Sequence, residues 1–172
     1  MSNNMQLMSN VRAHVSCMKP LGHAIVVFSL ALVAGCSSSA GEFSVALGKR
    51  LQVERQPVVD LAKVTSLNWE ELFIFGPYSI REESCKLLQL SWLECRFTIP
   101  SSVDEGEYFL VFRAKQKVVH SERHARGNGD FHSRGGRRPQ PVSHLSAKFN
   151  VVPTGSATPQ GAQWFRLEYA NP

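Results

Sequence analysis

The most specific chemistry in this sequence belongs to Cys36, which ends an apolar run over residues 24–35. Val33, Ala34 and Gly35 stand directly before it, and the small side chains at 34 and 35 leave the backbone open to a peptidase. The Cys36 thiol is the only atom at this point able to take up a lipid. The run is shorter than the about 20 apolar residues that cross a bilayer, which disfavours a transmembrane anchor. A plain thiol after an ordinary export signal is the other alternative.

With Lys19 ahead of the apolar run, this segment resembles the signal peptide and lipobox of bacterial lipoproteins. The resemblance implies that Cys36 carries a thioether-linked diacylglycerol, that the chain is cut before Cys36, and that the new N-terminus is acylated, for example with palmitate. Ser37, in place of an aspartate, resembles lipoproteins sorted to the outer membrane of diderm bacteria, facing the periplasm. Residues 1–35 are then leader and signal peptide, and we interpret Met18 as the true start because 1–17 do not fit the pattern.

Two cysteines remain for the exported part of the chain, because Cys17 lies in the leader and Cys36 takes the lipid. An even pair in an exported domain favours a disulfide between Cys85 and Cys95. Two buried free thiols are the alternative. A metal site is disfavoured because neither cysteine has a CxxC partner or a nearby histidine.

Four histidines and an aspartate gather in the second half of the chain. They are His120, His124, His132 and His144 with Asp130. The spacing of His120 and His124 suits two metal ligands on a helix, but the region is predicted to be strand and loop, where that spacing does not converge. We therefore predict solvated histidines and no metal or other cofactor.

The stretch 125–141 is rich in glycine, proline and arginine, with too little apolar surface to offset the entropy of ordering. We predict a long mobile basic loop. Its arginines are the candidate residues for binding a polyanion such as lipopolysaccharide or anionic lipid, because a guanidinium pairs well with phosphate: Arg126, Arg134, Arg137 and Arg138. A merely solvated loop is the alternative. An exported protein meets little nucleic acid, and the loop glycines do not form a nucleotide-binding motif.

No recognised catalytic pattern accompanies these residues. The serines lack a G-x-S-x-G elbow. The paired acids Glu70–Glu71 and Glu82–Glu83 fall at a predicted strand start and in a predicted first helical turn, where the second pair already has a capping role. A hydrolase with an unrecognised site stays as the alternative to a non-enzymatic protein, and no catalytic residue is assigned.

The elements that must position these groups follow from hydrophobic periodicity. We expect a tether over 36–42, a globular domain over 43–172, and either a strand or a short helix over 57–64. Strands are predicted at 69–75, 93–99, 107–113, 118–123, 147–151 and 163–169. The strand over 118–123 turns polar quickly and is expected at a sheet edge.

One helix is predicted over about 80–89. Ser79 and Glu82 have the spacing of a capping box, and Ile80, Ser84, Leu87 and Leu88 would form its inner stripe. Cys95 would sit on the core face of the strand over 93–99, so that the disulfide would join helix to strand.

Trp69, Glu70, Leu72, Pro77 and Tyr78 form a W-[DE]-x-[LV]-x-x-x-x-P-Y stretch. It is similar to one found in small uncharacterised bacterial lipoproteins and secreted proteins, and the resemblance brings no activity with it. On physical grounds Trp69, Phe73 and Tyr78 are expected to pack a strand-turn-helix corner.

These patterns predict a single α+β domain, with an antiparallel sheet of about five strands and one main helix. The chain has 172 residues, a formal charge of +5, and acids and bases that concentrate in different regions, over 68–107 and 113–138. We expect a lipid-anchored, non-enzymatic binding or scaffolding module whose partners are the membrane and either envelope proteins or anionic lipid.

Overall fold

The computed structural model describes residues 40–132, 139–158 and 161–170, all of which belong to the unit Cys36–Pro172. The predicted α+β class is confirmed. The helices are α1 (Glu42–Val53), α2 (Arg81–Leu88) and α3 (Trp92–Thr98), with short 3-10 turns η1 (Leu61–Lys63), η2 (Arg126–Asn128) and η3 (His144–Ser146). The strands are β1 (Val58–Asp60), β2 (Glu71–Phe75), β3 (Glu107–Ala114), β4 (Lys117–Ala125), β5 (Asp130–Phe131), β6 (Val142–Ser143), β7 (Lys148–Ala157) and β8 (Gln163–Tyr169).

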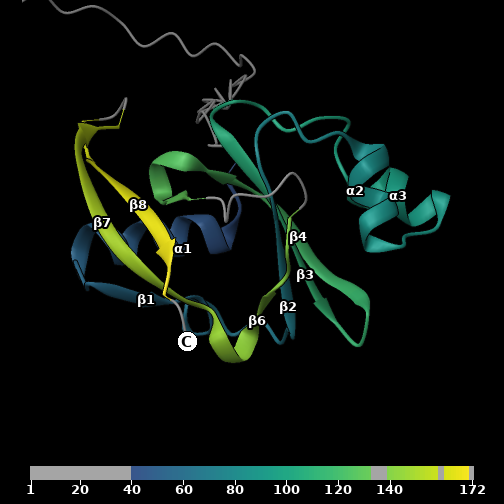
Figure 1. Ribbon diagram of the computed structural model, residues 1–172, viewed down its shortest axis with the longest axis horizontal. Coiled ribbons are helices and arrows are strands. Elements are labelled where there is room, and N and C mark those ends of the chain that lie inside the picture. Colours follow the sequence, from purple (N-terminus) through teal and green to yellow (C-terminus); the bar gives the residue numbers. More distant parts are fainter. Residues whose placement is uncertain (1–39, 133–138, 159–160, 171–172) are drawn as a thin grey trace, which may run out of the picture. The chain divides into compact units, whose positions relative to one another are not determined.

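The strands form two sheets of four (Figure 1). Sheet 1 has the order β4-β3-β2-β6, and sheet 2 has the order β1-β7-β8-β5. All pairings are antiparallel except that of β5 with β8, which is parallel. The prediction of one sheet with about five strands is therefore wrong in the number of sheets, and the described residues hold three helices where one main helix was predicted.

Sheet 1 separates two hydrophobic cores because its side chains alternate between its faces. On β3, Leu110 and Phe112 point into the larger core with α1 and sheet 2, whereas Phe109 and Val111 point into the smaller core with α2. Figure 1 accordingly shows α1 and the α2–α3 pair on opposite sides of β2, β3 and β4. Two apolar faces on one strand explain why β2 and β3 are almost continuously apolar in sequence.

Several predicted elements are confirmed within the described residues. The strand over 69–75 is β2, that over 107–113 is β3, and the hairpin returns along β4, which lies at an edge of sheet 1. The strands over 147–151 and 163–169 are β7 and β8. The stretch 57–64, for which either a strand or a short helix was predicted, contains both, because strand β1 is followed directly by the 3-10 turn η1.

Helix α1 docks on β4 through a buried carboxylate. Glu122 is 7% exposed and accepts hydrogen bonds from the backbone N–H groups of Phe43 (3.1 Å) and Ser44 (2.7 Å), in the first turn of α1. The Gly41 N–H donates to the Arg123 carbonyl, and a Cβ at Gly41 would clash with the Glu122 side chain. A negative charge at the positive end of the helix dipole thus fixes the start of the domain against sheet 1.

Candidate binding surface

The α2–α3 hairpin is the candidate binding site, because it carries a surface cleft and a group of exposed apolar side chains. Helix α2 begins after Ile80, which has extended backbone angles and no side-chain cap. The residues around Ile80 pair with Ser101–Val103 through the bonds Arg81 N–H to Ser101 O and Val103 N–H to Ser79 O. This bridge holds Ser79 in an extended segment, so the predicted capping box of Ser79 and Glu82 is wrong. Ser84 and Leu88 of the predicted stripe are buried, but Ile80 is 43% exposed.

Residues 93–99 form a helix and not the predicted strand. The capping box of the hairpin lies here, because Ser91 accepts from the Glu94 N–H and the Glu94 carboxylate accepts from the Ser91 N–H (3.0 Å). The hydrogen bond from the Ser91 hydroxyl, followed by that from its N–H, lowers the pKa of Glu94. The Ser-x-x-Glu spacing at 91–94 indicates the start of a helix, but the alternating apolar residues at 93, 95, 97 and 99 favoured a strand.

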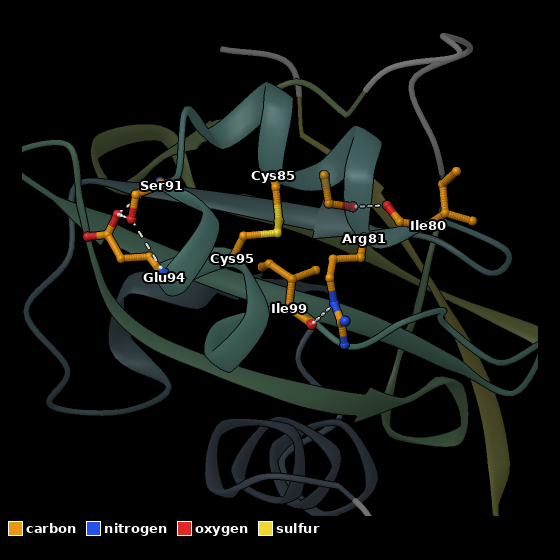
Figure 2. Close-up of a disulfide and its surroundings, with 8 residues drawn as sticks. Ile80, Arg81, Cys85, Ser91, Glu94, Cys95 and Ile99 are labelled. Atoms are coloured by element: carbon orange, nitrogen blue, oxygen red, sulfur yellow. Dashed lines mark hydrogen bonds between the residues drawn. A yellow bond between two sulfur atoms is a disulfide. The ribbon is translucent and has the colours of Figure 1, made fainter.

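The predicted disulfide between Cys85 and Cys95 is confirmed, with Cα atoms 5.5 Å apart. It joins α2 to α3, however, so the prediction that it joins helix to strand is wrong. Figure 2 shows the bond between the two helices, with Ser91 and Glu94 on one side of it and Ile80 on the other. The Arg81 side chain adds a second link by donating from Nε to the Ile99 carbonyl at 2.8 Å.

The outer surface of α3 is apolar. Trp92 is 74% exposed, Leu93 57% and Phe97 80%, and the Arg96 guanidinium lies 5.9 Å from the centre of the Trp92 ring. At 100° per residue these four side chains share one side of the helix, whereas Cys95 points back to α2. Ile99, which follows the last helical residue in an extended conformation, is buried in the small core. We call Trp92, Leu93, Arg96 and Phe97 the α3 arc. No buried side chain belongs to α3 itself.

A cleft of about 820 Å³ lies on the side of α2 that faces away from α3. Its apolar lining comes from Phe75, Ile80, Leu87 and Pro139, and its polar lining from Ser79, Glu83, Ser84, Lys86 and Gln89. The Ser84 hydroxyl is already used by the Ile80 carbonyl, at 2.9 Å. A lining that combines apolar walls with hydrogen-bonding groups and charges of both signs offers contacts to a ligand that has both apolar and polar groups.

The strand-turn-helix corner that was expected from Trp69, Phe73 and Tyr78 does not form. Trp69 is buried in the larger core, Phe73 in the smaller one, and Tyr78 is 71% exposed. The three side chains therefore do not pack together, because Trp69 precedes β2 and enters the core on the other face of sheet 1 from Phe73, and Tyr78 lies on the surface after the end of β2.

The first part of the predicted mobile loop is structured, which corrects the prediction for 125–132. Phe131 is buried in the larger core, where β5 pairs with β8. Arg126 donates to both oxygens of Asp130, at 2.8 and 2.9 Å, and this hydrogen bonding raises its pKa. Arg126 is thus engaged within the protein. Arg134, Arg137 and Arg138 lie outside the described residues, and polyanion binding through them stays a prediction.

Asp130 is the centre of a polar cluster. Burial opposes its ionisation, but hydrogen bonds from Arg126, Tyr108 and Trp164 together lower its pKa. The Tyr108 hydroxyl donates to Asp130 at 2.7 Å, and burial followed by this hydrogen bond raises the pKa of Tyr108. Each of these groups is paired with another, so the cluster joins β3, η2 and β8 to one another.

The histidines are not uniformly solvated as predicted. His124 is completely buried, with Nε2 2.7 Å from the Gly129 carbonyl, and burial lowers its pKa to about 4. His120 pairs with Glu122 at 2.8 Å, and His144 packs edge-on against Trp69. Of these four histidines in the described part of the chain, His132 alone is exposed as expected. Within the described residues, no three His, Cys, Asp or Glu side chains come together in a group that could hold a metal ion.

Comparisons with protein families, with curated proteins and with solved structures find no match to this chain. Among the helices of the described part, none is long and apolar enough to cross a bilayer. The predicted lipobox and Cys36 lie outside the described residues.

Proposed function

We propose that this protein is an envelope lipoprotein, anchored through lipid on Cys36 to the periplasmic face of the outer membrane. We further propose that it acts as a non-enzymatic binding module. The residues 33–36 and Ser37 support the anchor. The Cys85–Cys95 disulfide supports export, because disulfides persist in oxidising compartments such as the periplasm.

The cleft beside α2 is the observation that carries the binding role. Its apolar lining can receive an apolar side chain, and the Ser79 hydroxyl and Gln89 amide can pair with backbone polar groups of a ligand. Glu83 and Lys86 offer charges of both signs at the same site. This combination fits a short extended segment of an envelope protein, in which apolar side chains alternate with a hydrogen-bonding backbone.

The anchor is tested by replacing Cys36 with alanine in the full chain. We expect the variant to keep its leader, to incorporate no labelled palmitate and to be lost from the outer-membrane fraction. Cys17→Ala is the matched control, because Cys17 lies in the proposed leader, and it should be processed like the wild type. A Cys36→Ala product with unaltered mass and fractionation would show that the proposed anchor is wrong.

The cleft is tested by photo-crosslinking in intact envelopes. A crosslinking residue at Leu87, which lines the cleft, should give a discrete adduct with one protein, and Ile80→Glu should reduce its yield about tenfold or more. The same residue at Val45, a 52% exposed position on α1, is the control and should give no such adduct. Equal labelling from both positions, or a yield indifferent to Ile80→Glu, would contradict the binding role of the cleft.

A further inference from the structure

The α3 arc keeps large apolar side chains in contact with water, which is unfavourable for the free protein. Trp92, Leu93 and Phe97 are each more than half exposed, and they follow one another on one side of a seven-residue helix. Single exposed apolar residues are ordinary in proteins, but three adjacent large ones mark an interaction surface. The Cys85–Cys95 bond and the Ser91–Glu94 capping box hold α3 in place without burying any of the three.

We propose that the α3 arc lies in the interfacial layer of the lipid bilayer to which Cys36 is anchored. The inference rests on the proposed function for the presence of that bilayer. Trp92, Leu93 and Phe97 enter the boundary between head groups and acyl chains, where tryptophan and phenylalanine are favoured. The Arg96 guanidinium reaches outward to lipid phosphates while its aliphatic stem stays beside the apolar residues.

The chain geometry allows the lipid anchor and the α3 arc to reach one plane. Four residues lie between Cys36 and Gly41, and the five steps from one Cα atom to the next span at most about 17 Å at about 3.4 Å each. Gly41 is fixed to Arg123 on β4, and near the other end of that strand Val118 packs against the smaller core together with Cys95 of α3. The strand between Lys117 and Arg123 covers about 20 Å, a distance comparable to the reach of the tether.

The shape of the α3 arc favours lipid over a folded partner. Its side chains project from a helix of less than two full turns, and the cleft lies on the other side of the hairpin. A fluid interface can surround projecting aromatic rings without a complementary pocket, and Trp92 with Arg96 stacked on it combines an apolar body with a cationic group. With α3 in the interface, the cleft on α2 stays open to the periplasm.

The test uses residues 40–172, which lack the lipid. Both described cores are built from residues 43–169, so we expect this part to fold without its leader. It is mixed with vesicles of phosphatidylethanolamine containing a minor share of phosphatidylglycerol. We expect partitioning that persists at high salt and a blue shift of tryptophan emission. Trp92→Phe should remove the shift and keep the partitioning, because Trp69 is 2% exposed and Trp164 is already partly covered.

A double variant, Trp92→Ser with Phe97→Ser, should lower partitioning about tenfold or more. Leu145→Ser is the matched control, because Leu145 is a 92% exposed residue on η3, and it should change nothing. No wild-type partitioning would overturn the proposal while leaving the anchor intact. Partitioning unchanged in the double variant would overturn it as well. Dimerisation abolished by the double variant, without partitioning, would assign the α3 arc to a second copy instead.

Discussion

Replacing Glu122 with alanine is expected to lower the free energy of unfolding by about 3–5 kcal/mol. The carboxylate is buried and receives the N–H groups of Phe43 and Ser44 and a ring nitrogen of His120. Alanine would leave these donors without an acceptor in a site closed to water, which costs more than the bonds themselves contribute. Helix α1 would loosen first, because Glu122 joins its first turn to β4.

Urea unfolding of residues 40–172 measures this effect. Glu122→Gln keeps one carbonyl acceptor and should cost only about 1–2 kcal/mol. Glu168→Ala is the control, because Glu168 forms a partly exposed pair with Arg166 and its loss should cost about 0.5 kcal/mol. Hydrogen exchange at the Phe43 and Ser44 amides should accelerate in the alanine variant. Equal midpoints for Glu122→Ala and Glu168→Ala would contradict the anchoring role.

The hairpin of β3 and β4 illustrates what local pattern can predict. A long apolar run, a short polar connection and a return strand that turns polar are all visible within residues 107–123. The disulfide was predictable for a similar reason, since assigning Cys17 to the predicted leader and Cys36 to the predicted lipid anchor leaves only Cys85 and Cys95. The number of sheets could not be predicted, because the same alternation of apolar and polar residues fits a strand of either sheet.

The α3 segment shows where periodicity is too short to decide. Residues 93–99 alternate as a strand would, yet the same residues place Trp92, Leu93, Arg96 and Phe97 on one side of a helix. The capping box of Ser91 and Glu94 was the better signal for the local structure. The candidate surface was missed because an apolar residue in a predicted strand is assigned to the core by default.

The burial of Glu122 and Phe131 depends on contacts with residues that are distant in the sequence, which the local sequence pattern does not predict. The two backbone N–H groups that donate to the Glu122 carboxylate are 78 and 79 residues away in the chain. Phe131 is the one aromatic apolar side chain in the glycine- and arginine-rich stretch 125–141, and it becomes a core residue where β5 pairs with β8. Composition predicted a loop there, and long-range pairing decided otherwise.

Lowering the pH from 7 to about 4.5 is expected to destabilise the protein through His124. Burial depresses the folded-state pKa of His124 from 6.5 to about 4. Between these values the unfolded chain binds a proton that the folded chain does not, so stability is complete above pH 6.5 and is lost as the pH falls toward 4. At 1.36 kcal/mol per pKa unit, the full loss is about 3 kcal/mol.

The slope of the unfolding free energy against pH separates this effect from the packing of His124, whose ring lies 5.1 Å from that of Phe131. His124→Gln retains a donor for the Gly129 carbonyl and cannot be protonated in this range, so its unfolding free energy should fall much less steeply between pH 6.5 and 4.5. His132→Gln is the control and should keep the wild-type slope, because His132 is exposed.

Asp130 does not produce the slope in this window, because its pKa is lowered below 3.8 and its stabilising charge is lost only at more acidic pH. A variant with the wild-type slope would mean that another buried group takes up the proton.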